Sequence, residues 1–154
     1  MSLFTTQFMD NMSKLTCTRK IHFSSGHRVL HHEGKCVNPH GHNYYAHIFA
    51  EAEHLDSLGR VIDFSVLKEK IGSWIDTHFD HTFLVYEKDS DMIAALNLVK
   101  GSKPPFICPF NPTAENIADY LLTVVCVEEL KEYAVKVTKV IIYETDNCYA
   151  EAST

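Results

Sequence analysis

The fold of this chain depends on the stretch His42-Asn-Tyr-Tyr-Ala-His-Ile-Phe-Ala-Glu-Ala-Glu53. Its even-numbered positions from 44 to 52 are mostly apolar, whereas its odd-numbered positions include one asparagine, one histidine and two glutamates. Such alternation predicts a β-strand with one buried face and one wetter face.

The segments on either side of this stretch extend the same pattern. Residues 16–25 also alternate, with Cys17, Ile21 and Phe23 on one side, and predict a preceding strand. Between the two lies a histidine-rich loop, residues 28–41, which contains glycine, asparagine and proline as breakers.

The rest of the chain adds two helices and two further strands. Asp63 is a suitable N-cap for a helix to about residue 77, and Thr113 for a second helix ending near residue 133. Residues 82–111 predict a long surface excursion with a short helix near 91–100. A β-branched run over 135–145 and a short segment over 148–152 predict the last strands. This order indicates an α+β fold with helices packed on an antiparallel sheet.

The composition limits the class of protein. The chain has 154 residues, 45% of them hydrophobic, and a formal net charge of −6. We expect a flexible N-terminal arm over 1–14 and a single domain over 15–154. The absence of any basic block argues against nucleic-acid binding. No run approaches the roughly 18 apolar residues that span a bilayer, and five scattered cysteines do not suit a disulfide framework. We therefore expect a cytoplasmic protein with reduced thiols and no membrane partner.

Three histidines lie at the predicted strand ends. His40 and His42 are two positions apart and point to the same face of a strand, while His27 follows the preceding strand. If these strands pair as a hairpin, the imidazoles converge at one rim of the sheet. A catalytic zinc commonly has three such ligands and an open fourth position, so we expect a zinc site here. The alternative is a set of surface histidines, which is what we expect of His31 and His32.

Cys36 in the same loop has two interpretations. As a fourth zinc ligand it would close the site into a structural Cys-His₃ centre without chemistry. As a thiol held near zinc and imidazoles, it would work as a base or nucleophile. The residues alone leave both open.

Two further carboxylates are candidates for chemistry. Asp80 precedes His81 directly after the first predicted helix, and a carboxylate beside an imidazole orients it for proton relay. The same dipeptide is more often a loop cap. Glu144 ends an apolar strand, where a carboxylate is either exposed or anchors the N–H groups of a ligand. Spacing alone does not decide between these roles.

Several motifs of the chain occur in an order typical of one enzyme family. They are Phe23-Ser-Ser-Gly-His27-Arg28, Cys36-Val-Asn-Pro-His40-Gly41-His42-Asn43-Tyr44, Val61-Ile62-Asp63-Phe64, Phe79-Asp80-His81, Asn111-Pro112-Thr113-Ala114-Glu115-Asn116-Ile117-Ala118 and Tyr143-Glu144-Thr145. Over about residues 19–150 the chain resembles the 6-pyruvoyl-tetrahydropterin synthase and 6-carboxytetrahydropterin synthase family.

The resemblance implies a fold and an assembly. The family has the tunnelling fold, in which a four-stranded antiparallel sheet carries two helices on one face. Its subunits form trimers whose strands close a barrel, usually paired into homohexamers, and the active site lies between subunits. Closure of the barrel also removes exposed sheet edges.

The resemblance implies roles for the residues of the histidine-rich loop. His27, His40 and His42 would be the ligands of Zn²⁺. Cys36 would be the base that abstracts a proton from the substrate.

Roles also follow for the residues outside that loop. His81, oriented by Asp80, would relay protons with the cysteine, reaching it from a neighbouring subunit. Glu144 would anchor the 2-amino and ring N–H groups of a pterin and join the relay. Thr113 and Glu115 match a motif near the substrate pocket, although Thr113 is chiefly a helix start.

The family substrate is 7,8-dihydroneopterin triphosphate. Elimination of triphosphate gives a pyruvoyl product of tetrahydrobiopterin biosynthesis, whereas further carbon-carbon cleavage releases acetaldehyde and leaves a 6-carboxy group. The short spacing from Cys36 to His40 is similar to that of the bacterial queuosine-pathway enzymes and favours 6-carboxytetrahydropterin synthase. The Asn38-Pro39 dipeptide resembles the pyruvoyl branch, which remains the alternative. Two further alternatives are a structural zinc-binding module and an oligomer that binds pterin without turning it over.

Overall fold

A computed structural model describes residues 13–154, so the expected arm over 1–14 lies almost wholly outside the described residues. The strands are β1 (Cys17–His27), β2 (His40–Glu51), β3 (Thr82–Tyr86), β4 (Phe106–Cys108), β5 (Lys136–Thr145) and β6 (Cys148–Ser153). The helices are α2 (Phe64–Leu67), α3 (Ser73–His78), α4 (Ser90–Asn97), α5 (Ala114–Tyr120) and α6 (Cys126–Glu129). A π-helical turn joins α2 to α3 over Lys68–Gly72, and another joins α5 to α6 over Leu121–Val125.

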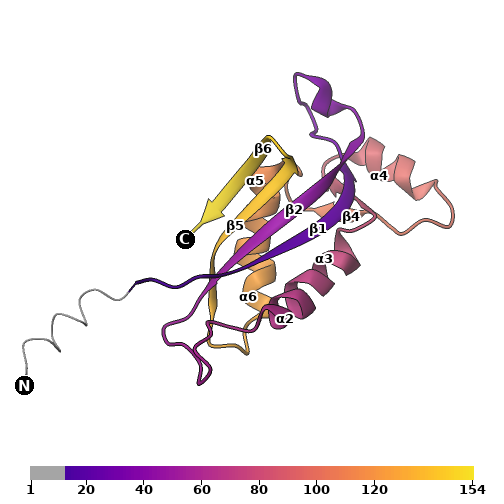
Figure 1. The fold of residues 1–154 in the computed structure, drawn as a ribbon. Helices are drawn as coiled ribbons and strands as arrows, with labels where there is room; N and C mark the ends of the chain where they lie inside the picture. Colours follow the sequence, from indigo (N-terminus) through magenta and orange to yellow (C-terminus); the bar gives the residue numbers. More distant parts are fainter. Residues whose placement is uncertain (1–12) are drawn as a thin grey trace, which may run out of the picture.

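The strands of the described part form one six-stranded mixed sheet in the order β4-β3-β1-β2-β5-β6 (Figure 1). The pairs β1–β2, β2–β5 and β5–β6 are antiparallel and correspond to the four strands expected from the sequence. β3 pairs with β1, and β4 with β3, in parallel. The expectation of a four-stranded, purely antiparallel sheet was therefore wrong.

The two additional strands lie in the segment interpreted as a surface excursion. β3 has five residues, and its consecutive Leu84 and Val85 are both buried, so the strand lacks the alternation of a half-buried one. β4 has three residues and follows two prolines. Neither gives a periodic signal, although the short helix expected near 91–100 is present as α4.

The two long helical runs lie on the same face of the sheet (Figure 1). The run over 64–78 packs on β1, and the run over 114–129 packs on β5 and β6. Both predicted starts are confirmed, because the Asp63 side chain accepts a hydrogen bond from the N–H of Ser65 and Thr113 accepts one from the N–H of Asn116. Each of the two expected helices is present, and each contains a π-helical turn that divides it into two α-helical segments.

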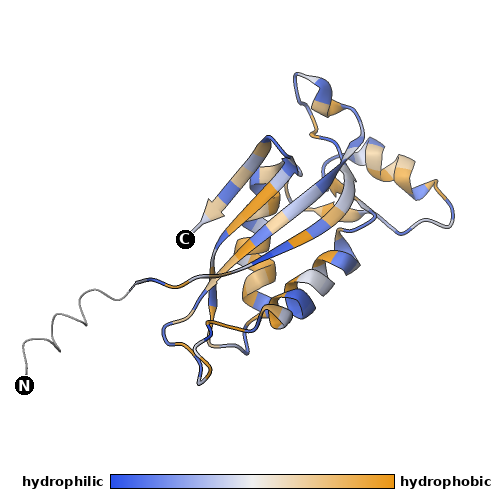
Figure 2. Cartoon of the chain, in the orientation of Figure 1, coloured by the Kyte–Doolittle hydropathy of each residue, from blue (hydrophilic) through white to orange (hydrophobic). Residues whose placement is uncertain are grey.

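Hydropathy varies from residue to residue along β1 and β2 (Figure 2), and burial alternates along both strands, with the buried positions contributing to the core. The largest side chains in this core include Phe23, Tyr44, Ile48, Leu67, Ile71, Ile117, Leu121 and Ile142. Within residues 13–154, no helix has the length and apolar character needed to cross a membrane.

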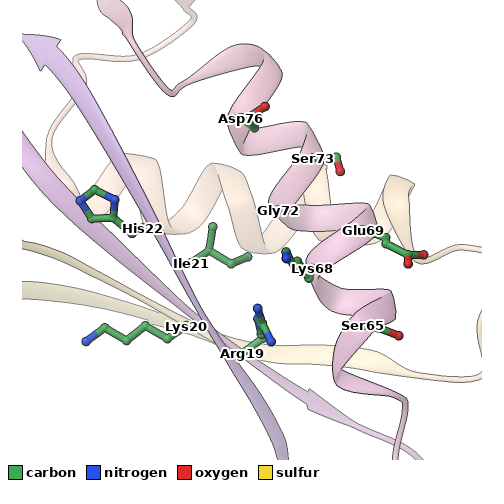
Figure 3. A pocket seen from close by; sticks show the side chains of 10 residues that line it. All are labelled: Arg19, Lys20, Ile21, His22, Ser65, Lys68, Glu69, Gly72, Ser73 and Asp76. Atoms are coloured by element: carbon green, nitrogen blue, oxygen red, sulfur yellow. The ribbon is translucent and has the colours of Figure 1, made fainter.

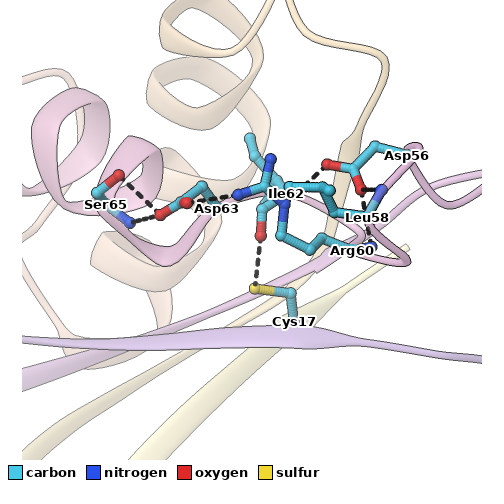
Figure 4. Close-up of polar contacts among 7 residues, drawn as sticks. All are labelled: Cys17, Asp56, Leu58, Arg60, Ile62, Asp63 and Ser65. Atoms are coloured by element: carbon cyan, nitrogen blue, oxygen red, sulfur yellow. Dashed lines mark hydrogen bonds and ion pairs between the residues drawn. The ribbon is translucent and has the colours of Figure 1, made fainter.

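A polar network closes the loop that follows β2. Asp56 accepts hydrogen bonds from the backbone N–H groups of Leu58, at 2.9 Å, and Arg60, at 3.0 Å. The Arg60 guanidinium also bridges Asp56 and Asp63 (Figure 4). This network lies at the end of β2 opposite the histidine-rich loop and fixes the start of α2.

The excursion is tied to the histidine-rich loop by one ion pair. Asp89 is buried, forms a two-point ion pair with Arg28 and caps α4 through the N–H of Met92. Hydrogen bonding from Arg28 holds the pKa of Asp89 below its usual range. Since Arg28 follows His27 directly, the excursion is anchored beside the end of β1.

Candidate active site

The register of β1 and β2 brings together the three histidines. His27 lies opposite His40, and Ser25 lies opposite His42. β1 extends to His27 and β2 begins at His40, two residues beyond the predicted bounds in each case, so all three belong to the strands. Their ring centroids lie 4.6 to 5.1 Å apart, and one ligand atom from each lies within 4.8 Å of the others.

Hydrogen bonds orient two of the imidazoles. The Nδ1–H of His27 donates to the carbonyl of Pro112, and that of His40 to the carbonyl of Asn38, both at 2.7 Å. The Nε2 atoms are then unprotonated, face one another at 3.1 Å, and suit a tetrahedral zinc, whose nitrogen ligands are about 3.3 Å apart. The Nε2 of His42 is buried without a hydrogen-bond partner among the described residues. This arrangement fits a zinc ion.

Burial lowers the pKa of two of the three imidazoles. It lowers the pKa of His27 to about 4, with the neighbouring His40 and His42 adding to the effect and the Pro112 carbonyl opposing it. Burial also lowers the pKa of His42. The buried ring of Tyr44 meets His27 and His42 edge-on and fixes their orientation from below. Neutral imidazoles are the form that binds metal.

Two glycines allow the close approach of the strands between the ligand positions. Gly26 and Gly41 lie opposite each other. A Cβ on Gly26 would lie 2.6 Å from the ring of Phe83, and one on Gly41 would lie 3.0 Å from the carbonyl oxygen of Ser25. A larger residue at either position would push β1 and β2, or β1 and β3, apart.

A cavity of about 310 Å³ adjoins His27, one of the three histidines. Its walls come from the histidine-rich loop, the start of α5, the end of β5 and the start of β6. They include His27, His32, Cys36, Thr113, Glu115, Glu144, Cys148 and Tyr149. The structure therefore gathers most of the predicted site residues around one space.

Two carboxylates give this cavity its electrostatic character. Glu144 lies 3.9 Å from the Nε2 of His27. Burial, reinforced by the negative charge of Glu115, raises the pKa of Glu144. A ligand that offers paired N–H donors would relieve this repulsion and satisfy both carboxylates.

The thiol of Cys36 belongs to the cavity wall and is half-buried. The atoms that converge on the metal position come from the three histidines, and Cys36 is not among them. The cysteine lies on a 3₁₀ turn over Lys35–Val37, and its carbonyl accepts the N–H of Val29 at 2.8 Å. This placement favours an open metal site with a thiol beside it.

His32 differs from the expectation of a surface histidine. It is half-buried and lines the cavity, and its Nδ1 accepts the N–H of Gly34 at 2.8 Å. Its Nε2 therefore carries the proton when the ring is neutral. His31 is exposed as expected and has a positive φ of 65°. The sequence does not distinguish these neighbours, because the tight turn alone decides which one faces inward.

Asp80 and His81 are held together on the edge of β1. The N–H of Ser24 donates to Asp80 at 2.7 Å, and the N–H of His81 donates to the carbonyl of Ser24 at 2.7 Å. His81 Nδ1 lies 2.6 Å from the second carboxylate oxygen of Asp80. Although burial opposes it, hydrogen bonding from Ser24 and His81 keeps the pKa of Asp80 below its usual range.

This pair does not reach the cavity of Cys36 within one chain. The His81 side chain is 82% exposed and lines a separate hollow with Ser24, Asn43 and Phe83. The structure therefore places His81 and Cys36 at two different cavities.

Sequence reasoning missed the groups that support the ligands. The carbonyls of Asn38 and Pro112 are backbone atoms, so no side-chain type marks them. The Asn111-Pro112-Thr113 motif indicated a helix start and a place near the substrate pocket, but not the hydrogen bond from His27 to the Pro112 carbonyl.

Comparison with known proteins identifies the family. A family model described as 6-pyruvoyl tetrahydropterin synthase matches residues 16–154. The chain belongs to this family. The family recognised from the ordered motifs is thereby confirmed.

Sequence relatives carry the name of the carboxy branch. A 6-carboxy-5,6,7,8-tetrahydropterin synthase of Rickettsia conorii is 38% identical over 137 residues, which cover 89% of this chain and 99% of that protein. A protein of the same name from Helicobacter pylori is 32% identical over 77% of this chain and 62% of its own length.

Solved structures share the fold. A Wolinella succinogenes protein superposes with a TM-score of 0.77 at 23% identity, covering 93% of this chain and 99% of its own. The Caenorhabditis elegans 6-pyruvoyl tetrahydropterin synthase does so with a TM-score of 0.61 at 28% identity, covering 94% and 98%. The family and these neighbours imply the tunnelling fold.

The ligand assignment is tested by His42→Ala. Two imidazoles hold zinc far more weakly than three, so zinc bound after dialysis against a weak chelator should fall from about one ion per chain to near zero. Metal analysis by plasma mass spectrometry measures this. His54→Ala, at an exposed position beyond β2, is the control and should keep its zinc. Full zinc retention in His42→Ala would exclude His42 as a ligand.

Proposed function

We propose that this protein is a zinc-dependent lyase that converts 7,8-dihydroneopterin triphosphate and one water molecule to 6-carboxy-5,6,7,8-tetrahydropterin, acetaldehyde and triphosphate. The observation that carries the proposal is a convergent imidazole site beside a cavity that also holds a thiol and two carboxylates. The names of the sequence relatives support the carboxy product.

The ring of the substrate would lie against the carboxylates. A pterin presents a 2-amino group and a ring N–H side by side, which match the two oxygens of Glu144. Glu115 would add a second acceptor, and Thr113 holds the start of α5 that carries it. A neutral donor pair suits this position because its hydrogen bonds would stabilise the charged form of Glu144, which burial and Glu115 disfavour.

The side chain of the substrate would extend toward the histidines. Zinc held by His27, His40 and His42 would supply positive charge that stabilises developing negative charge on the substrate hydroxyl oxygens. Cys36, in the adjacent wall, would remove the carbon-bound proton as a thiolate. His32 lies in the same loop. Its Nδ1 already accepts the N–H of Gly34 and its neutral ring carries a proton on Nε2, so it would not compete for that proton.

Proton return requires a neighbouring subunit in this proposal. His81 is exposed, and Asp80 holds its Nδ1, which leaves Nε2 available to a partner. A second copy that places His81 over the cavity would complete the relay with Cys36. The site would then form only in the oligomer.

The sheet has two open edges that suit such an assembly. β3 pairs only with residues 25–27 of β1, and Asp80 and His81 bind the backbone of Ser24. The outer edge of β1 over 17–23 therefore has no strand partner within the described part, and neither does the outer edge of β6. A groove of about 560 Å³ runs along the β1 edge beside the helical run over 64–78 (Figure 3). We propose that the edges of β1 and β6 join between copies into the barrel of a trimer or hexamer. The larger hollow is thus an assembly groove, while the chemistry lies in the smaller cavity.

The alternative function is 6-pyruvoyl-tetrahydropterin synthase, which acts on the same substrate. The Caenorhabditis elegans neighbour carries that name, and the Asn38-Pro39 dipeptide favours it. The same residues would serve both reactions, since elimination of triphosphate is their common step. A closed structural zinc site is the non-enzymatic alternative, and the position of Cys36 argues against it.

The products formed from 7,8-dihydroneopterin triphosphate test the function. We expect mass spectrometry to detect acetaldehyde and a 6-carboxypterin, with turnover lost on chelation and restored by zinc. A pyruvoyl product would move the protein to the other branch. Unchanged substrate with zinc-loaded oligomer would refute both reactions.

Cys36→Ala separates the enzyme from the structural zinc module. Removal of a general base typically costs about 10² to 10⁴ in rate. We expect such a loss of turnover with zinc content and thermal unfolding temperature unchanged. If Cys36 closes the metal site, zinc content and unfolding temperature would both fall instead.

Glu144→Gln tests the ring anchor. Gln keeps one acceptor oxygen and loses the other, so pterin binding should weaken about 10- to 100-fold, because one charge-assisted bond contributes roughly 1.5–3 kcal/mol. Zinc content should not change, since the proposed partners lie on the ring. Calorimetric titration with a pterin measures the effect, and Glu53→Gln, exposed beyond β2, is the control. Equal affinity in wild type and Glu144→Gln would remove Glu144 from the site.

A further inference from the structure

We infer that Asn111 is a positioning residue whose side-chain amide fixes the loop that presents Cys36. Asn111 contacts neither the histidines nor the cavity, and it acts through the backbone of Leu30. The inference rests on the proposed function only where it assigns a reaction to Cys36.

The amide grips one residue of the loop from both sides. Asn111 Oδ1 accepts the backbone N–H of Leu30 at 2.9 Å, and Asn111 Nδ2 donates to the carbonyl of the same residue at 2.9 Å. The two residues are 81 positions apart, so this contact joins the loop between β1 and β2 to the segment before α5. Both hydrogen bonds are part-buried.

The gripped residue lies within a compact hydrogen-bonded loop. The N–H of Val29 donates to the carbonyl of Cys36 at 2.8 Å. The residue directly before Leu30 is therefore hydrogen-bonded to the cysteine. The N–H of His32 donates to the carbonyl of Val29 at 3.1 Å and closes a tight turn. A displacement of Leu30 is therefore passed to the cysteine by a short chain of bonds.

The turn over residues 29–32 contains a strained backbone conformation, which contacts from outside the turn must stabilise. His31 occupies its third position with a φ of 65°, a conformation that favours glycine or asparagine. A non-glycine residue in this region persists where surrounding contacts determine it. The amide of Asn111 grips the residue directly before His31 and supplies such contacts.

Asn111 is itself held firmly. Its carbonyl accepts the side-chain amide of Asn116 at 2.9 Å and the N–H of Thr113 at 2.8 Å. The next residue, Pro112, gives its carbonyl to His27 at 2.7 Å. The dipeptide Asn111-Pro112 thus makes two contacts. The Pro112 carbonyl orients His27, and the Asn111 side chain holds the loop that carries Cys36.

The histidine-rich loop is also held by a second contact, which does not involve Asn111. Arg28 at the base of the loop pairs with the buried Asp89. Loss of the Asn111 amide would therefore loosen the turn without detaching the loop or the excursion.

Asn111→Ala tests the inference in the zinc-loaded protein. A displacement of the order of 1 Å in a reacting group can cost about 100-fold in rate. We expect kcat to fall about 10- to 100-fold, KM to change less than about threefold, and zinc content to stay at the wild-type value. Asn111→Asp keeps the acceptor for Leu30 N–H and loses the donor, so its kcat should lie between those of Ala and wild type.

Thiol alkylation gives a readout that does not depend on activity. Peptide-resolved mass spectrometry after iodoacetamide treatment reports Cys36 and Cys148 separately. Both thiols line the same cavity, and Cys148 comes from β6 rather than the loop. Because local opening exposes the thiol, Cys36 should react about tenfold faster in Asn111→Ala, while the rate of Cys148 should not change.

Asp56→Ala is the matched control. It also removes a side chain that accepts backbone N–H groups in a connecting loop, at the opposite end of β2 (Figure 4). It should lower the unfolding temperature without changing kcat or the Cys36 alkylation rate.

Two results would overturn the inference. Wild-type alkylation of Cys36 in Asn111→Ala would show that the amide does not hold the loop. Equal acceleration at Cys36 and Cys148, or loss of zinc, would show general disruption instead of positioning. If the wild-type protein shows no turnover, the proposed function fails, and the alkylation comparison still decides the role of Asn111.

Discussion

The pairing of β1 with β2 in one register is the constraint on which the site depends. It places His27 opposite His40 and leaves His42 two residues farther on the same face. A slip by one residue would turn one strand's histidines to the other side of the sheet and its apolar residues out of the core. The core therefore enforces the geometry of the ligands, because the same alternation serves both.

Much of the fold follows from periodicity. Alternation predicted β1, β2, β5 and β6, and side-chain capping by Asp63 and Thr113 predicted where the helical runs begin. β3 and β4 could not be found in this way, because they are short and pair in parallel without alternating along their length. Their strand character comes from partners distant in the sequence, so a local pattern carries no trace of it.

The site residues also separate into those that a local sequence pattern predicts and those that depend on distant parts of the chain. Parity along the strands was sufficient to bring the three histidines together, and the family motifs indicated Cys36 and Glu144. The carbonyls that orient His27 and His40, and the grip of Asn111 on Leu30, involve backbone atoms that only the folded chain brings near. The distinction between His31 and His32 depends on a single turn. The exposure of His81 and its pairing with Asp80 likewise depend on how the chain folds around the edge of β1.

The close contact of Phe83 with Gly26 links two parts of the molecule that otherwise seem unrelated. At this point no side chain thickens the sheet, and the phenyl ring occupies the space that a Cβ would need. A larger residue at 26 requires the ring of Phe83 to move or a smaller residue at 83. Substitutions at these two positions are therefore expected to be coupled during evolutionary divergence, which links β3 to the end of β1 that carries His27.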